Sequence, residues 1–278
     1  MLGSKPSDGS AEMNIIILAN RDIASNYAVN LLLPKLSENK ITIFLSAKVG
    51  GISKKPAELI RLKFFEQDLY NRIIAPLLPS PAERSSSFMT FEQMSAICQQ
   101  PVIELNNINS IEGLAMLDKA QPDLILSIRY GVILKNAAIS AARIGVLNLH
   151  SGLLPNYRGV MATFWAMLNG EKTIGTTLHY INDANIDTGD IVDTTTMKVD
   201  GSRSYLSHVL ELYQQGSNLM ANTVNKIASD KTIACQPQID AGNYYSFPND
   251  EELSAFTAKG LTLVDEQELT QLITDHYY

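Results

Sequence analysis

The stretch that decides the fold of this chain runs Asn148-Leu149-His150-Ser151-Gly152-Leu153-Leu154-Pro155-Asn156-Tyr157-Arg158-Gly159. It follows the apolar run Ile144–Leu147, which is typical of a buried strand. Side chains two residues apart in a strand point to the same face, so we expect Asn148 and His150 to project together near the strand end. An amide that donates a hydrogen bond and an imidazole that moves a proton suit attack on a carbonyl group.

A carboxylate from a second loop would complete this set, and the downstream segment Ile186-Asp187-Thr188-Gly189-Asp190 supplies one in Asp187. Each of the three residues also has a purely structural interpretation. Asn148 can form a turn at the strand end, His150 can be a hydrogen-bonded core histidine, and Asp187 can be a turn residue ahead of Gly189. Taken one at a time, the residues leave these alternatives open.

Strand-like and helix-like segments alternate on the amino-terminal side of this stretch. Apolar runs predict the strands, and apolar residues at helical spacing predict the helices. In the predicted helix Pro56–Leu78, the apolar residues at this spacing form a stripe along one face that ends at Ile73 and Leu77. This alternation predicts an α/β fold with a doubly wound, mostly parallel, Rossmann-like sheet that binds ligands at the carboxyl ends of its strands. We expect strands at Asn14–Ala19, Ile41–Ser46, Val102–Leu105, Asp123–Ile128 and Val146–Leu149, and helices at Ala24–Leu36, Pro56–Leu78, Ile111–Lys119 and Lys135–Ala142.

The carboxyl-terminal side continues the pattern and then changes character. We expect a helix at Met161–Leu168, strands at Ile174–Ile181 and Asp190–Val199, and a long amphipathic helix at Tyr205–Ala228. Residues 1–12 are polar and lack the apolar segment of a signal peptide, so they are predicted to be a disordered leader. A catalytic domain is expected over residues 13–230, followed by a short carboxyl-terminal appendage over residues 231–278.

Composition narrows the class of protein. The 278 residues are 45% hydrophobic and 18% charged with a net charge of −7, which favours a cytoplasmic globular protein over a nucleic-acid-binding one. No apolar run is long enough to span a bilayer, so no membrane partner is expected. The two cysteines, Cys98 and Cys235, indicate neither a disulfide framework nor a zinc site. No two histidines have metal-ligand spacing, so we expect no metal and interpret His208 and His276 as surface residues.

Four motifs in order resemble the formyltransferase family that uses 10-formyltetrahydrofolate. They are Gly145–His150, Leu153–Gly159, Gly175–His179 and Asp187–Ile191, and the resemblance covers about Pro122–Asp200. The family includes methionyl-tRNA formyltransferase, glycinamide ribonucleotide transformylase and the sugar N-formyltransferases. The resemblance implies a formyltransferase in which the acceptor amine attacks the formyl carbon directly, with 10-formyltetrahydrofolate as co-substrate.

The resemblance also assigns catalytic roles to Asn148, His150 and Asp187. Asn148 would donate its side-chain N–H to the developing oxyanion, an interaction of about 2.7–4 kcal/mol in comparable sites. His150 would transfer the proton that lets the folate nitrogen leave. Asp187 would stabilise the charged form of His150 and help to organise a water that shuttles protons.

Folate binding, again by resemblance, is expected from backbone groups of two loops. Carried over to this chain, the loops are Val132-Ile133-Leu134 and Asp183-Ala184-Asn185-Ile186. Because recognition in the family is largely by the backbone, the side chains at these seven positions carry no independent signal.

Four further residues in or beside the motifs bear on the site: His179, Arg158, Gly152 and Val160. His179 is interpreted as a structural support rather than a catalytic group, and Arg158 as either a substrate-anion ligand or a structural ion-pair partner. Two positions depart from the family pattern. Gly152 stands where many relatives have serine, and Val160 where some sugar-modifying relatives have arginine.

The carboxyl-terminal segment bears on the identity of the acceptor. The tRNA enzyme carries a larger carboxyl-terminal barrel, and the acidic segment Asp240–Tyr278 would repel a polyphosphate backbone. We therefore expect a small-molecule amine, above all a nucleotide-linked amino sugar, and a possible homodimer. Tyr244–Pro248 would either stack on a base or clasp the tail to the main domain. The alternatives are hydroxyornithine or Met-tRNA as acceptor, a 10-formyltetrahydrofolate hydrolase, or a folate-binding protein without activity.

Overall fold

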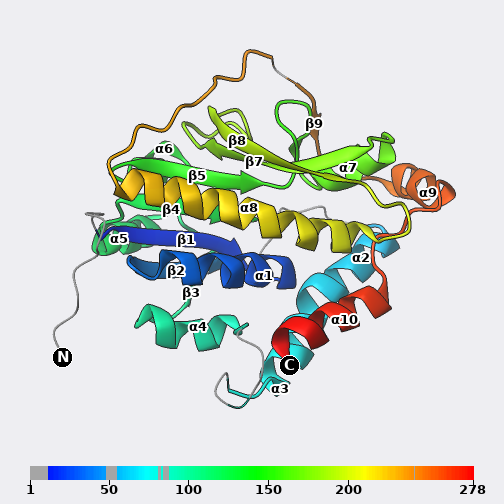
Figure 1. The fold of residues 1–278 in the computed structure, drawn as a ribbon, viewed down its shortest axis with the longest axis horizontal. Coiled ribbons are helices and arrows are strands. Elements are labelled where there is room, and N and C mark those ends of the chain that lie inside the picture. The colour runs from blue at the N-terminus through cyan, green and yellow to red at the C-terminus, as the bar shows by residue number, and fades with distance from the viewer. Residues whose placement is uncertain (1–11, 48–54, 81–82, 84–87, 241) are drawn as a thin grey trace.

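A central mixed β-sheet organises the molecule (Figure 1). The computed structural model describes residues 12–47, 55–80, 83, 88–240 and 242–278. Within these ranges one sheet has seven strands in the order β3-β2-β1-β4-β5-β7-β8. The first five of these are parallel, and β7 and β8 are antiparallel to their neighbours. The strands are β1 Asn14–Asn20, β2 Lys40–Ser46, β3 Ile103–Glu104, β4 Leu124–Ile128, β5 Gly145–His150, β7 Thr173–Tyr180 and β8 Ile191–Lys198.

Helices cover both faces of this sheet. On β1, Ile15 and Ile17 face the larger apolar core, and Ile16 and Leu18 face a smaller one. All four side chains are at most 1% exposed, which explains why this strand is an unbroken apolar run. The doubly wound, mostly parallel α/β fold is thereby confirmed. The larger core receives α1 (Ile23–Leu32), η1 (Leu33–Leu36), α4 (Phe91–Cys98), α7 (Ala162–Leu168) and α8 (Tyr205–Ala228); the smaller receives α5 (Ile111–Ala120) and α6 (Asn136–Ile139).

The helix predicted over Pro56–Leu78 differs from a regular α-helix. It consists of α2 (Ala57–Lys63), η2 (Phe64–Ile74) and α3 (Ala75–Leu77), and η2 is a π-helix. A π-helix closes its hydrogen bonds five residues apart, so its apolar face departs from the α-helical spacing. The predicted stripe is accordingly wrong at its end, because Ile73 is 47% and Leu77 is 70% exposed whereas Tyr70 is 1% exposed.

The carboxyl-terminal segment packs onto elements from the beginning of the chain. It contains β9 (Tyr244–Tyr245), α9 (Asp250–Ala258) and α10 (Glu266–Tyr277), and β9 pairs with β6 (Arg158–Gly159) in a separate two-stranded sheet. Helix α10 lies beside α2 (Figure 1), where Arg61 pairs with Glu266 at 3.0 Å. The Tyr277 hydroxyl donates to Asn26 Oδ1 at 2.6 Å inside the larger core. The appendage therefore shares its core with the preceding residues, and the domain boundary at residue 230 stays a prediction.

No helix in the described part of the chain combines the length and the apolar character needed to cross a membrane.

Candidate active site

The site is built on the antiparallel pairing of β5 with β7. In this register Asn148 lies opposite His179, and His150 lies opposite Thr177. Leu147 and Leu149 belong to the larger core, so Asn148 and His150 project from the opposite face, as their spacing predicts. The pairing therefore brings an amide and two imidazoles to one face of two neighbouring strands.

Asp187 reaches this cluster from the β7–β8 loop. Its Oδ2 lies 3.5 Å from His150 Nδ1 and accepts the backbone N–H of Gly159 at 2.8 Å, and its Oδ1 lies 3.5 Å from His179 Nε2. Burial raises the pKa of this carboxyl group, but the neighbouring imidazoles of His150 and His179 and the backbone N–H of Gly159 outweigh burial and lower the pKa to about 2. Asp187 is therefore ionised at any physiological pH.

The Asp187 loop is held in place by a residue far along the chain. Asp187 has a φ of 55°, a left-handed conformation in which it needs support from its surroundings. Gln238 Nε2 supplies that support by donating to Asp187 O at 3.0 Å and to Gly189 O at 2.7 Å. A Cβ at Gly189 would lie 1.7 Å from Tyr180 O, so only glycine fits there.

The orientation of His150 follows from its two neighbours. Its Nε2 lies 2.6 Å from Tyr157 O, and since a carbonyl only accepts, Nε2 carries a proton. Nδ1, which faces Asp187, is then the nitrogen that can gain or lose a proton. A Cβ at Gly152 would lie 2.8 Å from His150 Nε2 and 2.5 Å from Ala162 Cβ. Glycine rather than serine at position 152 is thus part of how this chain places His150.

His179 fixes the orientation of the Asn148 amide. His179 Nδ1 lies 2.8 Å from Tyr180 O and must donate to it, which leaves Nε2 as an acceptor in the neutral ring. Asn148 Nδ2 lies 3.0 Å from that Nε2, so one amide N–H is used there. The second N–H has no partner among the described residues. The side chain interpreted from sequence as a support therefore contacts two predicted catalytic residues, Asn148 and Asp187.

The two loops predicted to bind folate follow strands that flank β5. Residues 132–134 come after β4, and residues 183–186 come after β7. Ile133 is 56% exposed and its carbonyl accepts Asn109 Nδ2, whereas the Leu134 side chain is buried. The Asp183 carboxylate accepts both the backbone and the side-chain N–H of Asn185. Residues 183–186 lead directly into Asp187, and residues 132–134 follow the strand that pairs with β5. This arrangement is compatible with the predicted role, which stays a prediction.

A second polar cluster lies at the carboxyl ends of β1 and β4. Asp22 caps α1 by accepting Ser25 N at 2.7 Å, and it also accepts Asn20 Nδ2 at 2.8 Å and Arg129 Nε at 3.1 Å. Arg129 Nη2 in turn lies 3.0 Å from Glu66 Oε1. In doubly wound sheets, phosphates commonly bind at such a helix N-terminus. Here a protein carboxylate occupies that position and an arginine neutralises it.

Charge and burial oppose each other in this second cluster. Burial lowers the pKa of the Arg129 guanidinium, but the Asp22 and Glu66 carboxylates outweigh it and raise that pKa. Burial likewise raises the pKa of Glu66, and Arg129 only partly offsets the effect. Ion pairs between its own members, Arg129 with Asp22 and Arg129 with Glu66, therefore hold this cluster together.

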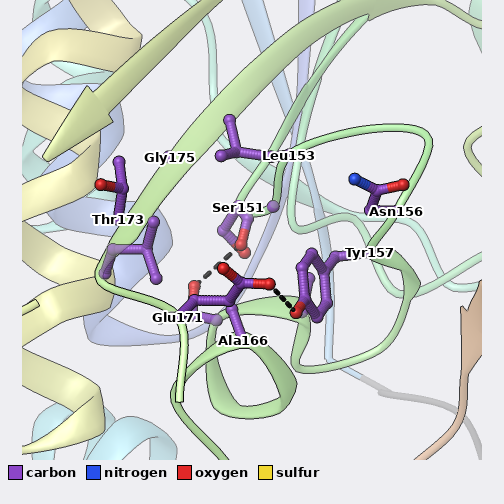
Figure 2. A pocket seen from close by; sticks show the side chains of 12 residues that line it. Ser151, Leu153, Asn156, Tyr157, Ala166, Glu171, Thr173 and Gly175 are labelled. Carbon is purple, nitrogen blue, oxygen red and sulfur yellow. Dashed lines mark hydrogen bonds between the residues drawn. The ribbon is translucent and has the colours of Figure 1, made fainter. Parts of the chain in front are cut away.

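A small cavity adjoins the site but does not contain the reacting groups. Its volume is about 90 Å³, and it lies beside the segment from Ser151 to Tyr157 (Figure 2). The Tyr157 hydroxyl donates to Glu171 Oε1 at 2.8 Å at its wall, and burial raises the pKa of Tyr157 to about 12. Asn148, His150 and Asp187 do not line it, so it is separate from the catalytic cluster.

Aromatic residues join the carboxyl-terminal segment to the site. The Tyr245 ring stacks on Trp165 with centroids 4.8 Å apart and on Tyr157 with centroids 5.6 Å apart. Trp165 Nε1 donates to Ser246 O at 3.1 Å. Tyr245 thus acts as a clasp, one of the two interpretations of this segment, whereas Tyr244 is 52% exposed.

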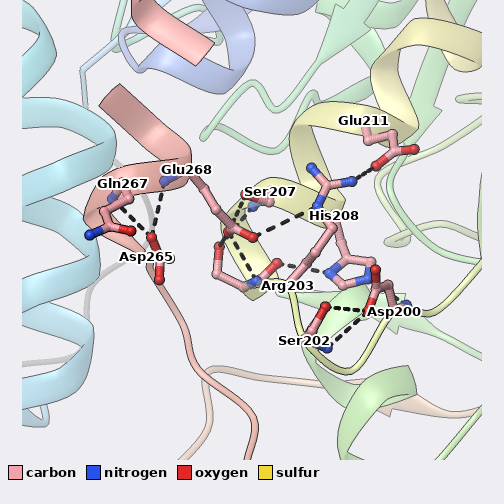
Figure 3. Close-up of polar contacts among 10 residues, drawn as sticks. Asp200, Ser202, Arg203, Ser207, His208, Glu211, Asp265, Gln267 and Glu268 are labelled. Atoms are coloured by element: carbon pink, nitrogen blue, oxygen red, sulfur yellow. Dashed lines mark hydrogen bonds and ion pairs between the residues drawn. The ribbon is translucent and has the colours of Figure 1, made fainter. Parts of the chain in front are cut away.

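A further polar cluster, at the N-terminus of α8, is structural (Figure 3). Glu268 of α10 accepts the Ser204 N–H and hydroxyl and the Ser207 hydroxyl at 2.5–3.1 Å. His208 is fully buried beside it, with Nδ1 2.8 Å from Ser204 O and Nε2 accepting Asp200 N at 3.1 Å. The prediction that His208 is a surface residue is wrong, because the first turn of α8 encloses its ring. His276 is half-buried and stacks on Phe88.

Sequence reasoning missed two functional contacts for lack of a local signal. Gln238 lies 51 residues beyond Asp187, and no spacing relates it to the motifs. The Tyr157 carbonyl that holds His150 is a backbone group, which carries no residue-specific signature. Among the described residues, no group of three or more histidine, cysteine or acidic side chains is placed to hold a metal ion.

Comparison with known proteins identifies the class that the fold and the cluster define. The sequence profile of the Formyl transferase family matches residues 14–224, about three quarters of the chain. The chain belongs to this family of enzymes, which confirms the resemblance drawn from the four motifs.

Individual relatives are more distant. The methionyl-tRNA formyltransferase of Clostridium tetani is 32% identical over 143 residues, 51% of this chain and 46% of that protein. The bifunctional polymyxin resistance protein ArnA of Wigglesworthia glossinidia brevipalpis is 30% identical over 213 residues, 76% of this chain and 31% of that protein. The chain thus matches less than half the length of these relatives. The N-formyltransferase of Helicobacter canadensis, solved with folinic acid and dTDP-3-aminofucose, has a TM-score of 0.52 and 15% identity over 83% of this chain and 70% of that one.

Proposed function

We propose that this chain transfers the formyl group of 10-formyltetrahydrofolate to the amine of a small molecule, and that the acceptor is a nucleotide-linked amino sugar. The observation that carries the proposal is the catalytic cluster of Asn148, His150, His179 and Asp187 on one face of β5 and β7. It combines an open amide N–H, an imidazole nitrogen that can exchange a proton, and a buried carboxylate.

In the first step the amine nitrogen forms a bond to the formyl carbon, and the carbonyl oxygen becomes an oxyanion. The second N–H of Asn148 is available to donate to that oxygen, because the first is held by His179. A donor that is already oriented contributes about 2.7–4 kcal/mol to transition-state stabilisation in comparable sites.

In the second step the bond from the formyl carbon to the folate nitrogen breaks. One proton leaves the acceptor nitrogen and one arrives at the folate nitrogen, so the products are an N-formyl compound and tetrahydrofolate. His150 Nδ1 is the group that delivers the proton, since Nε2 is held by Tyr157 O. Asp187 faces Nδ1 and stabilises the protonated ring between the two transfers.

The folate is proposed to lie against residues 132–134 and 183–186. The backbone N–H and C=O groups of Val132 and Leu134 make none of the hydrogen bonds recorded for the described residues, so they are available to a ligand. Folinic acid, a formyl folate, is bound by the Helicobacter canadensis enzyme, which supports the same donor here.

The nucleotide-linked acceptor is supported by that neighbour, which is bound to dTDP-3-aminofucose. A second candidate acceptor is Met-tRNA, since the Clostridium tetani relative is named methionyl-tRNA formyltransferase. The acidic first turn of α9, with Asp250, Glu251 and Glu252, weighs against a polyanionic partner at that surface.

The test is a spectrophotometric turnover assay with 10-formyltetrahydrofolate. The acceptors are dTDP- and UDP-linked amino sugars, hydroxyornithine, Met-tRNA and a control without amine. Formylation of an amino sugar supports the proposal. Formylation of Met-tRNA or hydroxyornithine alone would reassign the acceptor, and release of formate without any amine would reassign the chain to the hydrolases.

A further inference from the structure

We propose that Arg158 and Tyr244 form the subsite for the nucleoside diphosphate of the acceptor, with Arg158 binding phosphoryl oxygens and Tyr244 stacking on the base. The inference rests on the proposed function and specifies where the non-reacting part of the acceptor binds. It is carried by the two-stranded ribbon that β6 and β9 form next to Asp187.

The ribbon has a catalytic edge. Arg158 N and Val160 N donate to Asn243 O and Tyr245 O of the β9 segment at 3.0 and 2.9 Å. The intervening N–H, that of Gly159, points to the other edge and donates to Asp187 Oδ2. Strand β6 therefore lies between the carboxyl-terminal segment and the carboxylate of Asp187. Arg158 immediately precedes Gly159, whose N–H holds that carboxylate.

The ribbon also has a buried face and an open face. Tyr157 and Tyr245 stack on one another, and Tyr245 stacks on Trp165, so these rings mark the buried face. Arg158 and Tyr244 are paired in register, and successive side chains alternate between faces. The alternation assigns the Arg158 and Tyr244 positions to the face opposite the aromatic stack, and Tyr244 is 52% exposed.

Arg158 has unsatisfied hydrogen-bonding capacity at this position. It takes part in none of the ion pairs found among the described residues, and its Nε is buried without an acceptor. A guanidinium binds phosphate or carboxylate through two parallel N–H groups, and Nε provides one of them. The structural ion pair that the sequence left open for Arg158 is therefore not formed with any described residue, and an anionic ligand would satisfy the buried N–H.

Tyr244 supplies the second element of the subsite. Its ring lies against Gly159, where a Cβ would come within 2.9 Å of Tyr244 Cε2. Neighbouring strands are about 4.8 Å apart, so the guanidinium and the ring start from adjacent backbone positions. That separation suits a single ligand with an anionic group next to an aromatic one, which is the chemistry of a nucleoside diphosphate.

The alternative anion position at the same side of the sheet is already filled. The N-terminus of α1 holds the Asp22 carboxylate, and Arg129 is committed to Asp22 and Glu66. A phosphate placed there would face two carboxylates. Arg158 is the arginine near the catalytic cluster whose charge no described side chain neutralises.

The experiment compares the wild-type protein with Arg158→Met, Tyr244→Ala and the control Arg72→Met, whose side chain is 78% exposed on η2. Isothermal titration calorimetry measures the dissociation constants of dTDP, UDP, pyrophosphate and folinic acid. Arg158→Met is expected to weaken dTDP, UDP and pyrophosphate by roughly 10–100-fold, the loss typical of a charged hydrogen-bond pair. Tyr244→Ala is expected to weaken dTDP and UDP by about tenfold, as for one stacked base, and pyrophosphate little.

Folinic acid separates failure of the subsite from failure of the proposed function. It is expected to bind all four proteins equally, so an equal loss of folinic acid binding in Arg158→Met would show a general defect and overturn the assignment. Equal binding of dTDP to wild type and Arg158→Met would overturn the subsite even if an amino sugar is formylated. If dTDP does not bind, and Arg158→Met instead raises the KM of hydroxyornithine, Arg158 recognises a carboxylate and the diphosphate assignment is wrong. If the wild type binds dTDP through Arg158 but formylates no amino sugar, the subsite stands and the proposed function fails.

Discussion

Two clusters of polar side chains lie at the carboxyl side of the same sheet, and they differ in how completely they satisfy one another. The closed cluster consists of Asn20, Asp22, Glu66 and Arg129, where each charge meets an opposite charge or a hydrogen bond within the cluster. The open cluster is the catalytic cluster, where one N–H of Asn148 has no partner among the described residues and His150 Nδ1 can exchange a proton beside Asp187. Both clusters are largely buried, so burial alone does not mark the reactive one. What distinguishes the reactive cluster is the hydrogen-bonding and proton-exchange capacity that its own members leave unused.

The largest effect is expected from His150→Ala, which removes the proton-transfer group from the open cluster. General acid–base groups contribute about 10²–10⁴ to rate, so kcat should fall by a factor in that range. Folinic acid affinity should stay within about twofold, because the ligand contacts proposed here are backbone groups. Single-turnover kinetics and calorimetry measure the two quantities. A variant with near-normal kcat would show that the open cluster does not perform the chemistry.

The closed cluster should respond in stability rather than in rate. Arg129→Met leaves Asp22 and Glu66 buried without their cation, which typically costs about 3–5 kcal/mol of unfolding free energy. Urea unfolding measures this loss. Adding Asp22→Asn and Glu66→Gln to Arg129→Met should recover part of it, since asparagine still caps α1 and no charge stays unpaired. A loss of kcat without a loss of stability would mean that the closed cluster is catalytic after all.

The ease of prediction from sequence differs between the two clusters. Asn148 and His150 lie two residues apart, so strand periodicity alone puts them on one face. Asp187 required the motif order, and its contact with His179 required the β5–β7 register, which residue spacing does not reveal. The closed cluster joins Asp22 to Arg129 across 107 positions, and nothing local relates them.

The fold shows the same division. The βα alternation was readable because each buried strand is a continuous apolar run, as in Ile15–Leu18. The π-helix η2 and the docking of α10 were not, because they depend on hydrogen-bond register and on distant partners such as Asn26 with Tyr277. Helix α4 is different, because it begins with a capping box of Thr90 and Gln93, a local signal that was missed.

Acid unfolding should sharpen the comparison through Asp187. The carboxyl pKa is 3.8 in the unfolded chain and about 2 in the folded one, so the folded state favours the ionised form. The resulting stabilisation, about 2 kcal/mol, is complete above the unfolded pKa and is lost as the pH falls through 2. The difference in unfolding free energy between wild type and Asp187→Asn should therefore be full at pH 6 and shrink below pH 3.8. Asp118→Asn, on the exposed side of α5, is the control. A difference that does not depend on pH would contradict the ionic role of Asp187.

The smallest effect concerns His179, whose proposed role is to orient Asn148 rather than to touch the reactants. His179→Ala frees the amide to rotate and present its oxygen, so kcat should fall by about tenfold while the KM for the folate stays constant. His179→Gln can place a carbonyl acceptor near Asn148 Nδ2 and should restore part of kcat. If His179 had a purely structural role, both variants would be less stable, and kcat would not be higher in His179→Gln than in His179→Ala. Equal kcat values for the alanine and glutamine variants would therefore remove His179 from the positioning of the oxyanion donor. The graded result would show that the open cluster keeps its free N–H available because a second histidine holds the other one.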